Sequence, residues 1–121
     1  MEFSEKHFEK YDFRCNVPLG SYFIRKDPHS ILSYSHDGDV FSIDPIHAYT
    51  EKPAWDRFLK EFNQFAYKRN GIPLLNQSPF VERRHVEAAY GARWSAFSAR
   101  AKKEDPQRRM LNLFFADLLS G

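Results

Sequence analysis

Carboxylate and imidazole groups lie close together in the segment His36-Asp37-Gly38-Asp39. Hard cations bind carboxylate oxygens arranged around a loop, and Zn²⁺ binds histidine together with acidic side chains. No second cluster of such ligands follows at a recognised spacing. Because Asp37-Gly38 is also a common dipeptide of hairpin turns, we interpret the segment as a turn and predict no metal site.

Two isolated histidines, His47 and His85, have the chemistry of general bases. His85 lies in the run Glu82-Arg83-Arg84-His85, which is typical of a solvated helix face, and His47 lies on a predicted strand near Asp44. A structural role is the favoured interpretation for both. Cys15 has no His or Asp at the spacing of a catalytic nucleophile, so we interpret it as buried or incidental.

Arg25 stands out in a strand predicted over residues 21–26, because the rest of that strand's centre is uncharged. Alternation places Tyr22 and Ile24 on one face and Phe23 and Arg25 on the other. Burying a guanidinium among aromatic rings is costly unless an anion or a ligand meets it. Arg25 is therefore a candidate site residue.

The amides Asn76 and Gln77 follow a short apolar run and precede Pro79. Such a polar tip can donate and accept hydrogen bonds, which makes it a plausible ligand contact. Capping by Asn76 or Ser78 explains the same residues equally well. Both interpretations stay open at this point.

Basic residues are in excess between Glu82 and Arg109, with eight Arg or Lys and four acids, and Trp94 and Phe97 are interleaved with them. A phosphate-binding face with stacking aromatics would have this composition. The two aromatics, however, follow the apolar stripe of a helix, and the whole chain carries a net charge of only +2. We therefore predict no nucleic-acid partner.

The composition is that of a folded protein of one domain, covering residues 1–121. Hydrophobic residues make up 42% of the chain, and 12 of them are Phe, which is enough for a core. No apolar run approaches the roughly 20 residues of a membrane span, and the start lacks the plan of a signal peptide. With Cys15 as its only cysteine, the chain is expected in the cytoplasm.

The pattern of apolar residues predicts an α+β fold, in which a small antiparallel sheet has helices packed on one face and a helical tail follows. Three strands are few for such an aromatic-rich chain, so we expect the sheet to be part of a larger one with edges paired by something else. The predicted elements are a helix over 3–11, strands over 21–26 and 40–43 with a continuation at 46–49, a helix over 54–69, a short edge strand over 72–75, a helix over 80–90, and two tail helices over 90–119 divided by a hinge at 104–107.

The tail resembles the C-terminus of FAD-linked oxidases of the vanillyl-alcohol oxidase superfamily, in particular the aldonolactone oxidase and cholesterol oxidase type. Those chains close with an RW-x-x-F helix, a DP turn and an LN-x-F/Y segment. The residues that carry the resemblance are Arg93-Trp94, Phe97, Asp105-Pro106-Gln107, Arg109-Met110-Leu111-Asn112 and Phe115. Upstream, Arg25-Lys26-Asp27 with Leu32-Ser33 is similar to their arginine strand, and Trp55–Asn70 with Gly71-Ile72-Pro73 to the helix and turn before their flavin-facing loop.

This resemblance implies the end of a cap domain that places substrate against the flavin of FAD, while an FAD-binding domain or subunit is the missing partner. It implies that Arg25 faces flavin and substrate as a catalytic residue, that Asn76 and Gln77 contact the cofactor, and that Tyr22 and His47 contact substrate. The family often has Glu where this chain has Phe23, and lactone oxidases have His-Trp-Gly-Lys where it has Leu75-Asn76-Gln77-Ser78. A less polar alcohol or a sterol-like substrate is therefore expected in place of a sugar lactone.

Three hypotheses follow for function. The first is a C-terminal fragment or subunit of an FAD-dependent oxidoreductase, inactive alone, that acts on an alcohol by hydride transfer to flavin. The second is a stand-alone interaction module without catalysis, which uses open sheet edges and an aromatic surface to form homo-oligomers or to bind a partner. The third and weakest is a nucleic-acid binder that uses the basic segment between Glu82 and Arg109.

Overall fold

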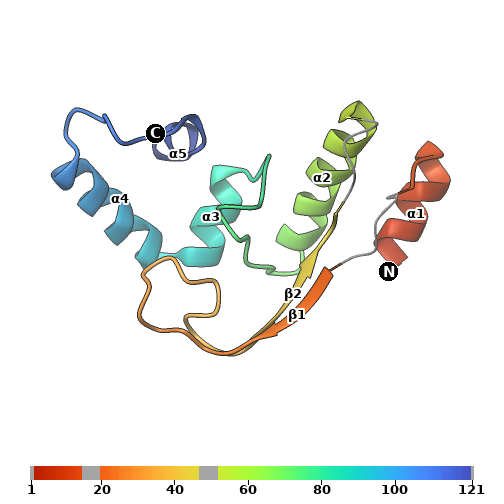
Figure 1. The fold of residues 1–121 in the computed structure, drawn as a ribbon, viewed down its shortest axis with the longest axis horizontal. Coiled ribbons are helices and arrows are strands. Elements are labelled where there is room, and N and C mark those ends of the chain that lie inside the picture. Colours follow the sequence, from red (N-terminus) through yellow and green to blue (C-terminus); the bar gives the residue numbers. More distant parts are fainter. Residues whose placement is uncertain (1, 15–19, 47–51, 121) are drawn as a thin grey trace.

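The computed structural model describes residues 2–14, 20–46 and 52–120, and these form five α-helices and one two-stranded antiparallel sheet (Figure 1). None of the helices described is long and apolar enough to cross a membrane. The predictions for Cys15 and His47 lie outside the described residues, as does most of the strand continuation predicted over 46–49. In chain order the elements are α1 (Glu2–Tyr11), β1 (Gly20–Ile24), β2 (Val40–Asp44), α2 (Lys52–Tyr67), α3 (Arg83–Tyr90), α4 (Ala92–Glu104) and α5 (Leu113–Leu119).

Helices α1 and α2 lie side by side and share an aromatic cluster centred on Phe58, which is fully buried (Figure 1). Glu61 of α2 ties the two helices together, because its carboxylate accepts from the Tyr11 hydroxyl at 2.8 Å and lies 3.1 Å from Nδ1 of the buried His7. Burial alone would raise the pKa of the Glu61 carboxyl, but the hydrogen bonds of Tyr11 and His7 outweigh it and leave that pKa lowered. The amphipathic helix predicted over residues 54–69 is confirmed as α2, which spans Lys52–Tyr67.

The second core lies between α3, α4 and α5, where Val86, Tyr90, Trp94 and Leu118 are buried. Trp94 stacks on Phe97 with ring centroids 5.7 Å apart, so these aromatics pack inward, as their position on the apolar stripe predicts. Gly91 joins α3 to α4 with a φ of +52°, a conformation that glycine adopts without steric cost. The tail thus forms the two predicted helices, α4 and α5.

The short edge strand predicted over residues 72–75 is wrong, because this segment is a loop that ends in a turn. Backbone carbonyls of this segment and of the preceding Gly71 contact side chains of α3 in place of a neighbouring strand. Tyr90 donates its hydroxyl to the carbonyl of Pro73 at 2.6 Å, and Nε2 of His85 lies 2.7 Å from the carbonyl of Gly71. Pro73 also has no N–H to offer a sheet ladder.

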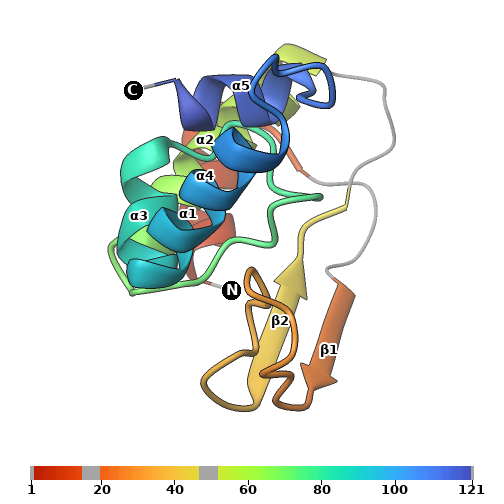
Figure 2. The same cartoon turned by 90° about the vertical axis from the view of Figure 1, so that its left-hand side faces the viewer.

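The β1–β2 hairpin projects from the helical body, and Figure 2 shows it below the stacked helices. The predicted α+β mixture and antiparallel strands are confirmed, but the described residues give two strands and a mostly helical protein. The expectation that helices cover one face of the sheet is not met, since Tyr22, Phe23, Phe41 and Ile43 are all exposed. The apolar faces of the helices instead meet one another in the two helical cores.

The buried hydroxyl of Tyr90 makes the free energy of unfolding fall at alkaline pH. Burial, as the largest cause, raises the pKa of Tyr90 to about 12, whereas an unfolded tyrosine has a pKa of about 10. The folded state therefore holds the proton more tightly, so this contribution is complete below about pH 10 and is lost as pH rises toward 12. We expect the free energy of unfolding, measured with urea at pH 9 and 11.5, to fall more steeply in the wild type than in Tyr90→Phe. Equal slopes would contradict this assignment.

Candidate functional site

The exposed side of the β1–β2 hairpin carries three large apolar side chains on one face. Phe23 pairs directly with Phe41, and Ile43 lies on the same face two residues along β2, opposite Ser21. Phe23 and Phe41 are each 65% exposed and Ile43 is 49% exposed. We call Phe23, Phe41 and Ile43 the hairpin face; it contains no charged residue.

Among the residues that the structure describes, both edges of this sheet are open, because each strand has a hydrogen-bonded neighbour on one side only. Unpaired edges present N–H and C=O groups that can pair with another strand. An isolated two-stranded hairpin is also marginally stable in water unless a further strand or a helix packs on it. The hairpin thus presents two strand edges and one apolar face to which further strands or a helix could be added.

Arg93 of α4 holds the long loop between the two strands against the helical body. Its Nη1 donates to the carbonyls of Ile31 at 3.3 Å and Ser33 at 2.9 Å, and its Nη2 lies 3.3 Å from Oδ2 of Asp37. Its side chain is 17% exposed. The hydrogen bond from His36, followed by the charge of Arg93, lowers the pKa of Asp37. Sequence reasoning did not assign this role to Arg93.

Arg25 lies just beyond the end of β1 and is exposed, which corrects its predicted place on a strand face with Phe23. Beyond the end of the strand at Ile24, the backbone N–H of Lys26 donates to the Asp39 carboxylate at 2.8 Å in place of a partner strand. Within the described residues, Arg25 has no hydrogen bond or ion pair. The guanidinium is therefore available to an external anion without having been buried. Tyr22, on the opposite face of β1 from Phe23, is 54% exposed.

Asn76 and Gln77 lie in an exposed turn, in which the backbone N–H of Gln77 donates to the carbonyl of Leu74 at 2.9 Å. Leu75 is buried beside them and anchors the turn to the core of α3, α4 and α5. No hydrogen bond or ion pair among the described residues joins this turn to Arg25 or Tyr22. The structure therefore does not assemble the predicted site residues into one cluster within this part of the chain.

His85 is buried, at 4% exposure, and the prediction that it lies on a solvated helix face is wrong. Its ring lies tilted against that of Tyr67, with centroids 5.3 Å apart, and contacts the carbonyl of Gly71. This arrangement ties α3 to the end of α2. The signal missed in the sequence is helical spacing, because His85 and the buried Val86 share the inner side of α3 with Tyr90.

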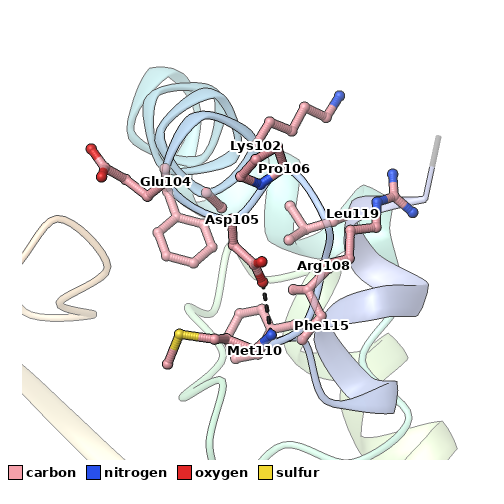
Figure 3. Close-up of a pocket in the computed structure, with 11 residues that line it drawn as sticks. Lys102, Glu104, Asp105, Pro106, Arg108, Met110, Phe115 and Leu119 are labelled. Atoms are coloured by element: carbon pink, nitrogen blue, oxygen red, sulfur yellow. Dashed lines mark hydrogen bonds between the residues drawn. The ribbon is translucent and has the colours of Figure 1, made fainter.

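A pocket of about 470 Å³ lies between α4, the connection 105–112 and α5 (Figure 3). Its lining is largely apolar and includes Phe97, Leu111 and Phe115, with Lys102 and Arg108 also contributing. We call it the α4–α5 pocket. The sequence indicates only packing in this tail, because the pocket arises from the path of the connection and not from a motif.

No group of three or more His, Cys, Asp or Glu side chains in the described residues could hold a metal ion. The segment 36–39 lies in the bend region of the loop between β1 and β2, where Nδ1 of His36 is 2.8 Å from Oδ1 of Asp37. The connection is thus a long loop and not the two-residue hairpin that Asp37-Gly38 suggests. No protein-family model, curated protein or solved structure matches the chain.

Proposed function

We propose that this chain is the C-terminal cap portion of an FAD-dependent oxidoreductase, in which the β1–β2 hairpin completes a sheet carried by a flavin-binding polypeptide. The observation that carries the proposal is the hairpin face together with the two open strand edges. Phe23 and Phe41, paired across the strands and 65% exposed, are the side chains that a further layer would cover. The resemblance of the tail to FAD-linked oxidases supplies the class of partner.

The residues present fit one part of such a site. Arg25 is exposed and has no partner among the described residues, so its guanidinium is available to stabilise negative charge that develops on a reduced flavin. Tyr22, three residues earlier in the chain, is also exposed. FAD bound by the partner would supply the acceptor for a hydride from an alcohol carbon. Nothing in the described residues forms a glycine-rich phosphate loop, and we expect the chain to be inactive alone.

The test is capture of a flavin-bearing partner by the tagged chain from its own cells. We expect the retained protein to release flavin on denaturation, detected by its fluorescence. In the double variant Phe23→Ser/Phe41→Ser, recovered flavin should fall by about tenfold or more, because buried aromatic anchors dominate most interfaces. Leu113→Ser is the matched control, since Leu113 is equally apolar and 87% exposed but lies on α5.

Capture without flavin, or equal recovery of flavin by both variants, would contradict the proposal. A further check needs no protein: in the source transcript, coding sequence for an FAD-binding half should either precede the Met1 codon in frame or be expressed as a separate chain. Its absence from both places would remove the partner that the proposal requires.

Self-association is the second candidate, favoured by the lack of charge on the hairpin face. A twofold dimer places identical patches against each other, so a patch of Phe23, Phe41 and Ile43 is self-complementary without like-charge repulsion. Light scattering of the wild type at high concentration would then give a mass twice that of one chain. The variant Phe23→Ser/Phe41→Ser would give the mass of a single chain. A mass that does not change with concentration would exclude this alternative.

A further inference from the structure

Hydrogen bonds within the connection 105–112 fix the shape of the α4–α5 pocket. The Asp105 carboxylate holds the connection in place, because its two oxygens accept from the backbone N–H groups of Arg109 at 3.0 Å and Met110 at 2.8 Å. The backbone N–H of Arg108 also donates to the carbonyl of Asp105 at 3.0 Å. Figure 3 shows the Asp105 carboxylate directed at the N–H of Met110. Asp105 is therefore committed to the loop and is not available to a ligand.

The floor and rim of the pocket differ in chemistry. Phe97, Leu111, Phe115 and Leu119 give it apolar walls, and its volume of about 470 Å³ lies within the range of about 300–1,000 Å³ typical of small-molecule sites. Met110 at the rim is 90% exposed, which is unusual for so apolar a side chain next to a hollow. An apolar tail or ring would cover this surface.

Two cations lie at the rim without partners. Lys102 and Arg108 line the pocket and are exposed, and their side chains have no hydrogen bond or ion pair among the described residues. Arg108 is held with a φ of +54°, a backbone conformation that costs about 1 kcal/mol or more for a residue with a side chain. In the view of Figure 3 the ends of Lys102 and Arg108 lie toward the upper right, and the Glu104 carboxylate lies at the left.

From this arrangement we propose that the α4–α5 pocket binds a monocarboxylate with an apolar tail, whose carboxylate meets Lys102 and Arg108. The surrounding charge supports an anion, since residues 100–109 contain five basic and two acidic side chains. The planar fork of a guanidinium also matches the two oxygens of a carboxylate. The proposal is independent of the flavin partner, because the hairpin face takes no part in it.

Decanoate is a suitable probe, with decanol as its uncharged analogue and decyltrimethylammonium as its cationic analogue, all below their micelle concentrations. The chain has two methionines, so ¹³C-methyl labelling gives two signals, and Met110→Leu assigns them. We expect decanoate to shift the Met110 methyl signal saturably. Decanol should bind at least about fivefold more weakly, since it lacks the charge-assisted hydrogen bonds, and the cation more weakly still.

The matched variants are Lys102→Gln/Arg108→Gln and Lys103→Gln/Arg109→Gln, which remove the same charge from inside and outside the pocket lining. The first pair should raise the Kd of decanoate by at least about fivefold, whereas the second should change it by less than about twofold. Calorimetry gives the same constants independently. Equal effects of the two pairs, no saturable shift of Met110, or a shift with anionic phospholipid vesicles but not with decanoate would each overturn the proposal.

Discussion

Phe58→Ala is expected to lower the free energy of unfolding by about 3–5 kcal/mol, a large share of the stability of a small protein. Phe58 has no exposed surface. Six aromatic rings have centroids 5.1–6.4 Å from its own, and they belong to Phe3, His7, Phe8, Phe13, Trp55 and Phe62. Removing the ring leaves a cavity between α1 and α2 that these rigid neighbours cannot fill. Urea denaturation at neutral pH measures the change.

Phe41→Ala is the control, because it removes the same ring from a site that is 65% exposed. Its loss is expected to stay below about 1 kcal/mol, the size of one cross-strand pair. The two variants thus separate burial from side-chain identity. A loss at Phe58 that is no larger than the loss at Phe41 would show that the aromatic cluster does not hold α1 and α2 together.

The helices are the part of the fold that the sequence predicts well, because each one repeats its apolar residues locally. The stripe through Phe58, Leu59 and Phe62 predicts α2, and Asn112 predicts the start of α5, where its side chain accepts from the N–H of Phe115 at 2.9 Å. The predicted helix over 54–69 runs two residues too far, because α2 ends at Tyr67. Asn70 takes the left-handed conformation with a φ of +57°, and the N–H of Gly71 donates to the carbonyl of Ala66 at 2.8 Å.

The rest depends on contacts between residues far apart in the chain, which periodicity does not reveal. His85 is buried where its ring contacts the carbonyl of Gly71. The β-forming run 72–75 is a loop, in which the carbonyl of Pro73 accepts a hydrogen bond from Tyr90. The candidate site follows the same rule. Alternation places Phe23 and Phe41 on one face of the strands, but only the three-dimensional arrangement leaves that face uncovered.

The motif Arg93-Trp94 also acquires a physical explanation from the structure. Trp94 is buried in the core of α3, α4 and α5, whereas Arg93 reaches out to the loop between β1 and β2. Adjacent residues on one helix thus connect the helical core to the hairpin. A spacing pattern identifies the core residue, but the acceptors of Arg93 are about 60 residues away and cannot be found from local sequence.

Arg93→Met is expected to release this loop while the helices stay folded. The guanidinium donates to the carbonyls of Ile31 and Ser33 and pairs with Asp37, and hydrogen bonds of a charged group contribute about 1.5–3 kcal/mol. Because the loop is partly exposed, water replaces some of this, and we expect the loop to open more easily by about 2 kcal/mol, or roughly thirtyfold in amide hydrogen exchange. The amides to follow are those of Asp27, Ser33 and His36, which are hydrogen-bonded within the loop.

Arg100→Met is the matched control for this prediction, since Arg100 lies exposed on the same helix and its side chain has no hydrogen bond or ion pair among the described residues. Exchange in the loop should be unchanged in Arg100→Met. Arg93→Lys should recover only part of the protection, because an ammonium cannot reach three acceptors in the geometry of a planar fork.

If the hairpin is the docking element that we propose, Arg93→Met should also reduce capture of the flavin-bearing partner, because an unanchored hairpin loses conformational entropy when it docks. Unchanged exchange in Arg93→Met would mean that the loop is held by its own turns and that Arg93 does not orient the hairpin.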